Sequence, residues 1–89
     1  MSTAYVFRLY ITGNAPNSAR ARSNLAAIAD ERLAGRHVIE EVDVLKEPGR
    51  ALADNILVTP TLVRLKPAPE CRIIGNLSER EKVVSTLGL

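Results

Sequence analysis

The stretch Tyr5-Val6-Phe7-Arg8-Leu9-Tyr10-Ile11-Thr12, followed by the turn Gly13-Asn14-Ala15-Pro16-Asn17-Ser18, decides the fold of this chain. Its alternating pattern, rich in aromatic and β-branched residues, predicts a strand over 5–12. Gly13 and Asn14 end that strand, and Asn17 or Ser18 can accept the free amides at the start of a helix. The chain therefore begins as a strand that leads through a tight turn into a helix.

The remaining elements follow from periodicity and from turn residues. We expect a helix over 18–33 ended by Gly35, a strand over 37–44, and a short helix over 47–55. Strands over 61–65 and 72–74 flank a proline-rich turn, and the pattern Ser78-Glu79-Arg80-Glu81 predicts a capping box that starts a last helix. The inner face of the first helix should consist of Ala19, Leu25, Ala26, Ile28, Ala29 and Leu33.

This order, βαβαββα, predicts an α/β fold of the thioredoxin-like type. The first crossover is long enough to hold a helix, so the first two strands should be parallel with a right-handed connection. The last two strands should form an antiparallel hairpin. Thr59-Pro60-Thr61 is the kind of step that precedes a strand in thioredoxin-type sheets, where Pro60 would be cis. The chain is short enough to form one domain over 1–89.

Composition excludes several classes of function. The net charge is only +2, and no basic tract is interleaved with aromatic residues, so nucleic acid is not an expected partner. No apolar run is long enough for a membrane span, and no signal peptide is visible, which predicts a cytoplasmic protein. We expect no cofactor and no metal site. Cys71 is the single cysteine, so the Cys-x-x-Cys pair of a disulfide oxidoreductase is missing and no enzymatic activity is expected.

Four blocks, in order, resemble the KaiB family of circadian-clock proteins: LYITGNAPNSARA (9–21), VDVLKEP (42–48), ILVTPTL (56–62) and RIIGNLSEREKV (72–83). The resemblance implies a non-enzymatic clock or stress regulator. Such proteins bind the first ATPase domain of the KaiC autokinase and modulate its phosphorylation cycle. In the full clock they also capture KaiA and displace the kinase SasA, whose sensor domain is itself thioredoxin-like.

The resemblance also implies two alternative folds. One state is a tetramer with the order βαββααβ, and the other is a monomer with the thioredoxin-like order, which alone binds KaiC. Thr86 and Gly88 stand where family members usually carry Gly and Asp. Thr raises helix propensity by roughly a few tenths of a kcal/mol, and losing Asp removes a charge that the helix dipole disfavours. We therefore expect the thioredoxin-like state. Tyr5 and Pro60 are further residues that the switch would involve.

Three arginines match basic positions at which KaiB-like proteins contact partners: Arg20, Arg64 and Arg72. Because strand residues alternate, Arg64 faces away from Leu65 and is expected to reach a partner's carboxylate. Three other positions depart from the family, because Glu40, Asn55 and Cys71 replace basic residues that are usual there. The loss of positive charge weakens an interface with an acidic partner, so KaiA binding is not expected.

Two other functions stay open at this point. The chain could be a thioredoxin-like thiol enzyme that uses Cys71, although no base that would activate this thiol is visible. It could also be a sensor domain of the SasA type, cut from a larger histidine kinase. Its start at Met1 and the absence of a following linker favour a free-standing protein.

Overall fold

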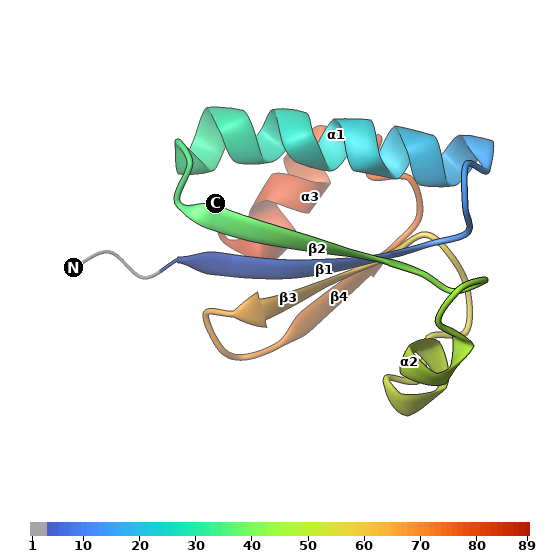
Figure 1. Ribbon diagram of the computed structural model, residues 1–89. Helices are drawn as coiled ribbons and strands as arrows, with labels where there is room; N and C mark the ends of the chain where they lie inside the picture. The colour runs from blue at the N-terminus through green and yellow to red at the C-terminus, as the bar shows by residue number, and fades with distance from the viewer. Residues whose placement is uncertain (1–3) are drawn as a thin grey trace.

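The structure, a computed structural model, describes residues 4–89. Its elements follow the predicted order βαβαββα (Figure 1). They are β1 (Tyr5–Ile11), α1 (Pro16–Leu33), β2 (His37–Asp43), α2 (Pro48–Ala53), β3 (Thr61–Lys66), β4 (Cys71–Ile74) and α3 (Arg80–Leu87). Within the described residues, no helix combines the length and the apolar composition that crossing a bilayer requires.

The strands form one mixed sheet in the order β2-β1-β3-β4. Strands β1 and β2 are parallel, as predicted, while β3 pairs antiparallel with both β1 and β4. Helices α1 and α3 lie on one side of the sheet, and the short helix α2 lies near one end of it (Figure 1). The peptide bond before Pro60 is cis, as expected, and so are those before Pro67 and Pro69.

Strand β1 carries apolar side chains on both faces of the sheet. Phe7, Leu9 and Ile11 point into the larger core, which they share with α1 and α3. Tyr10 points the other way, into a smaller cluster with Val42, Val63 and Ala51. A central strand must be apolar on both faces when helices cover both. The position of β1 between β2 and β3 therefore follows from its composition.

Helix α1 begins earlier than the sequence pattern predicts. Pro16 occupies its first turn, where the missing amide hydrogen costs nothing, and Ala15 is the N-cap. Ser18 is not a cap: it is buried, and its hydroxyl accepts a 3.0 Å hydrogen bond from the amide of Thr12. The predicted inner face is correct except that Ala21 is buried, whereas Ala19 and Ala26 are exposed.

Helix α3 also differs at its start. Its N-cap is Glu79, with no side-chain hydrogen bond, so the predicted capping box does not form. The amide of Ser78 instead donates to the side-chain oxygen of Asn76 at 3.0 Å. At the other end, Gly88 adopts a φ of 72° and closes the helix. This left-handed conformation favours glycine, which gives Gly88 a conformational role beside the predicted electrostatic one.

The structure corrects the expectation for Arg64, whose side chain is not accessible. Its residue exposure is 9%. One terminal nitrogen donates to the carbonyl of Leu87 at 2.7 Å, and the other donates to the carbonyl of Pro69 at 2.8 Å. The side chain does face away from Leu65, but α3 covers that face of the sheet. Arg64 thus caps the C-terminus of α3 from inside and joins it to the β3–β4 hairpin, a position that does not support contact with a partner's carboxylate in this fold.

We expect the substitution Arg64→Met to lower the free energy of unfolding by about 1–3 kcal/mol, because two carbonyls lose charged donors in a buried place. Urea denaturation followed by circular dichroism measures this change. The matched control is Arg32→Met in α1, where the arginine is solvent-exposed and lies 3.8 Å from Glu31. The control should change stability by less than about 0.5 kcal/mol. Equal effects of the two substitutions would contradict the capping role.

Candidate interaction surface

A carboxylate at the centre of β2 is held by two arginines from other elements. Arg50 of α2 donates to both oxygens of Glu40, at 2.8 and 3.0 Å, and Arg8 of β1 donates to one of them at 2.8 Å. The hydrogen bonds from Arg50 and then Arg8 lower the pKa of Glu40 to about 2. Sequence reasoning treated Glu40 as a lost positive charge for a partner. In the structure it joins β1, β2 and α2 within the chain.

A second carboxylate, Asp54, stands at the end of α2 and is held by two strands. The hydroxyl of Tyr10 in β1 donates to it at 2.7 Å, and Arg72 in β4 donates to its other oxygen at 3.1 Å. Burial, followed by the hydrogen bond to Asp54, raises the pKa of Tyr10. Arg72 also lies 3.4 Å from Glu70. The charge of Arg72, predicted to meet a partner, is thus shared between two carboxylates of its own chain.

Beside Arg72 the surface becomes apolar. Leu57 is 92% exposed, Ile74 is 69% exposed and Val58 is 47% exposed. With Asn55, Ile56, Thr61 and Arg72, they line one shallow hollow of about 100 Å³. We call Leu57, Val58 and Ile74 the apolar tip. Clustered exposed apolar side chains rimmed by polar groups are typical of protein–protein contacts, so the apolar tip is the strongest candidate for a docking surface.

The other predicted partner residue, Arg20, is exposed on α1. Helix α1 begins at the end of the sheet near which α2 lies, but on the opposite side of it (Figure 1). The three predicted arginines therefore do not form one cluster, since Arg64 is buried, Arg72 lies beside the apolar tip and Arg20 lies on α1. Whether Arg20 and Arg72 bind a partner stays a prediction.

The residues expected to influence the choice of fold are spread along the chain. Tyr5 is half-buried and stacks on Phe7, with ring centroids 6.1 Å apart. Pro60 is buried at the start of β3, and Gly88 closes α3. Thr86 is exposed and lines a hollow between β4 and α3. Their surroundings are those of ordinary packing and capping residues, and their role in a switch stays a prediction.

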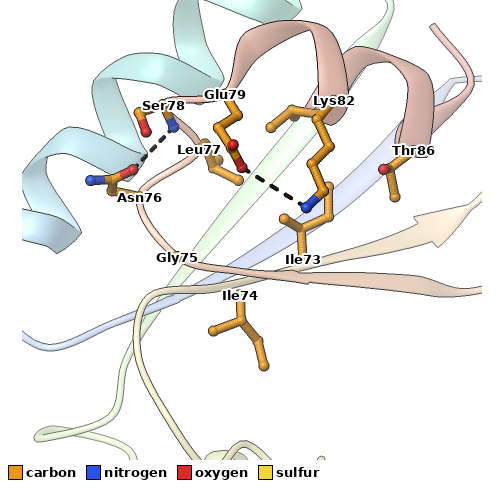
Figure 2. A pocket seen from close by; sticks show the side chains of 10 residues that line it. Ile73, Ile74, Gly75, Asn76, Leu77, Ser78, Glu79, Lys82 and Thr86 are labelled. Carbon is orange, nitrogen blue, oxygen red and sulfur yellow. Dashed lines mark hydrogen bonds and ion pairs between the residues drawn. The ribbon is translucent and has the colours of Figure 1, made fainter.

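The hollow beside Thr86 has a volume of about 230 Å³ (Figure 2). Ile73 points towards α3, whereas Ile74 points to the opposite side of β4 (Figure 2). Lys82 lies 3.9 Å from Glu79 at its rim. Its polar lining residues include Ser78, Glu79, Lys82 and Thr86, and the side chain of Glu79 is paired with Lys82 and not with either hydroxyl.

Cys71 is half-buried in β4 and packs against the larger core, where its register partner is Arg64. It lies in a strand and not at the N-terminus of a helix, the place that lowers the pKa of a reactive thiol in many oxidoreductases. Among residues 4–89, no group of three or more His, Cys, Asp or Glu side chains is placed to hold a metal ion.

Sequence reasoning missed the residues that now stand out, namely Asp54, Leu57 and Ile74. One pattern could have pointed to Leu57: the apolar run Ile56-Leu57-Val58 lies directly before the Thr59-Pro60 step, outside every predicted helix and strand. The structure also explains why asparagine occupies position 55. The φ of Asn55 is 56°, a left-handed conformation in which asparagine is enriched, so this residue suits the turn after α2.

A family model and several known proteins match this chain over nearly its whole length. The family model described as KaiB domain matches residues 8–89. A circadian clock oscillator protein KaiB from Prochlorococcus marinus is 47% identical over 85 residues, which is 96% of this chain and 81% of that protein. The protein of the same name from Trichodesmium erythraeum is 45% identical over 89 residues, 100% of this chain and 86% of that relative.

Among solved structures, the N-terminal domain of Synechococcus elongatus SasA superposes with a TM-score of 0.79 at 17% identity, covering 99% of this chain and 87% of that one. The Drosophila melanogaster thioredoxin Deadhead gives a TM-score of 0.76 at 15% identity, covering 99% of this chain and 83% of the thioredoxin. At such low identity these two likenesses show the fold alone, and they confirm that it is thioredoxin-like.

The depressed pKa of Glu40 predicts a pH dependence of stability. This pKa is about 2 in the folded chain, against an ordinary value of 4.5. The stabilisation of the folded chain by the contacts of Glu40 with Arg50 and Arg8 is therefore fully present above pH 4.5. It is lost as the pH falls from about 4.5 to about 2. We expect Glu40→Gln to unfold more easily than the wild type near neutral pH, by at most about 1 kcal/mol because the carboxylate is half-exposed.

Urea midpoints at several pH values test this expectation. The difference between Glu40→Gln and the wild type should shrink towards zero as the pH approaches 2. Glu81→Gln, at an exposed position in the first turn of α3, is the control: it loses only the favourable interaction of a carboxylate with the helix dipole, so its deficit should be about 0.3 kcal/mol and smaller than that of Glu40→Gln. A Glu40→Gln deficit that stays constant over this pH range would show that the ion pairs are not its cause.

Proposed function

Because the chain belongs to the KaiB family, we propose that it is a non-enzymatic clock or stress regulator that docks on the first ATPase domain of a KaiC-type autokinase. By docking it modulates the phosphorylation cycle of that enzyme. The observation that carries the proposal is the apolar tip, an exposed apolar surface on a fold whose turn before α1 contains no cysteine. It works in the cytoplasm, where such an ATPase resides.

The likeness to the SasA domain supports a second part of the proposal. A protein with the backbone shape of a SasA-type sensor domain can occupy the same place on a shared partner. We infer that this chain competes with a SasA-like kinase for the KaiC-type ATPase. KaiA is not a proposed partner. The carboxylate of Glu40, at one of the departures from the family, is engaged by Arg8 and Arg50 and offers no positive charge to it.

The proposed binding-competent state is the thioredoxin-like monomer, and a βαββααβ tetramer is the alternative state of a fold switch. Two features of α3 support this assignment. Gly88 closes its C-terminus in the left-handed conformation, and Arg64 donates to the carbonyl of Leu87. Both contacts need residues 80–87 to be helical, so both stabilise the thioredoxin-like order relative to any arrangement without α3.

Binding to a cognate KaiC-type ATPase tests the proposal directly. We expect a complex in size-exclusion chromatography, and isothermal titration calorimetry should show Leu57→Ala to bind about tenfold more weakly, because a Leu side chain no longer becomes buried. Arg20→Glu should also weaken binding, and more at low salt than at high salt. Arg64 is not a suitable test site, since its loss would disturb α3.

The matched control is Arg32→Glu, a charge reversal at the opposite end of the same helix, which should bind like the wild type. If Leu57→Ala and Arg20→Glu both bind like the wild type, the surface is assigned wrongly. If the wild type itself forms no complex, the proposed partner is wrong. An insulin-reduction assay tests the alternative of a thiol enzyme: turnover that disappears in Cys71→Ser would support that alternative and contradict a purely non-enzymatic role.

A further inference from the structure

The segment 54–59, which carries Leu57, is held at both ends by side chains from β1 and from Thr12, the residue directly after it. On its N-terminal side, Asp54 accepts the hydroxyl of Tyr10 at 2.7 Å. On its C-terminal side, the hydroxyls of Thr59 and Thr12 lie 2.5 Å apart. Tyr10 and Thr12 come from β1 and from the residue directly after it, so a single strand sets both ends of the segment.

Between these two ends the backbone has little freedom. The amide of Ile56 donates to the carbonyl of Ala51 at 2.9 Å, and the hydroxyl of Thr61 donates to the carbonyl of Val58 at 2.7 Å. Ile56 also packs against the smaller core. Leu57 is therefore the one residue of the segment that combines a large apolar side chain with nearly full exposure, 92%, on a backbone held on either side.

An exposed side chain on a fixed backbone is useful for binding, because less conformational entropy is lost when a partner covers it. The Tyr10 ring is 1% exposed and belongs to the smaller core, so it cannot touch a partner. Its hydroxyl is nevertheless placed on the carboxylate at the end of α2. Packing alone would need only the ring, and phenylalanine would supply it.

We propose that Tyr10, through Asp54, is a positioning residue that holds Leu57 where the partner meets it. The inference rests on the proposed function for the identity of the partner, the KaiC-type ATPase. It adds that the affinity of the apolar tip depends on a hydrogen bond buried beneath it.

The test substitution is Tyr10→Phe, which keeps the ring and removes the hydroxyl. Affinity for the KaiC-type ATPase should fall by roughly three- to tenfold. The same substitution made in a Leu57→Ala background should lower affinity by less than about twofold, because the side chain it positions is already gone. Ala29→Gly, in the buried part of α1 far from the segment along the chain, is the control for a general loss of stability, and it should leave affinity unchanged.

A second measurement needs no partner. Hydrogen exchange followed by NMR should show the amides of Asp54, Asn55 and Ile56 exchanging about tenfold faster in Tyr10→Phe, relative to the amide of Leu25 in α1. Ala29→Gly should not produce this difference. Together the two measurements separate failure of the positioning role from failure of the proposed function.

If the wild type does not bind the ATPase, the proposed function fails, and the exchange measurement alone decides the positioning role. If the wild type binds but Tyr10→Phe weakens binding equally in both backgrounds, or if exchange at 54–56 is unchanged relative to Leu25, the inference is overturned. An Ala29→Gly variant that binds as weakly as Tyr10→Phe would also overturn it, because global stability would then explain the loss.

Discussion

The burial of apolar side chains on both faces of β1 is the constraint on which the rest of the molecule depends. One face of this strand must be covered by α1 and α3 and the other by the smaller cluster around Tyr10. A strand buried on both sides belongs in the middle of a sheet, so β2 and β3 must lie on either side of it. With few aromatic residues available, the chain places all of them in this strand: Tyr5, Phe7 and Tyr10.

The sequence predicted the order of elements, the strand directions and the family, because these depend on periodicity, on proline and glycine, and on ordered motifs. It could not predict which side chains would be covered by elements far along the chain. Arg64 is an example: its side chain does face away from Leu65, as predicted, but α3, which buries that side chain, begins much later in the sequence. Ser78 and Ser18 looked like helix caps, but the backbone amide of Ser78 donates to Asn76, and the hydroxyl of Ser18 accepts from the amide of Thr12.

The candidate site was harder to predict than the fold for a related reason. Basic residues were matched to family positions one at a time, whereas in the structure Arg72 pairs with two acids of the same chain and Arg64 donates to two backbone carbonyls. Glu40, which replaces a basic residue of the family, is likewise held by an arginine, and the contacts of Arg72 and Glu40 tie strands to α2 and to Asp54 at its end. What remains free for a partner near α2 is mainly apolar, Leu57 above all. A docking surface of this kind selects its partner by shape more than by charge.

The contact between Tyr10 and Asp54 has a practical consequence, because the chain contains no tryptophan and only two tyrosines. Beyond the weak absorption of Phe7, its near-ultraviolet absorption and its fluorescence therefore originate from Tyr5 and Tyr10. A phenol that donates to a carboxylate emits weakly, since the excited hydroxyl passes its proton to the acceptor. Detachment of α2 from the sheet would separate Tyr10 from Asp54 and brighten the emission, so the unmodified chain carries its own optical probe of that helix.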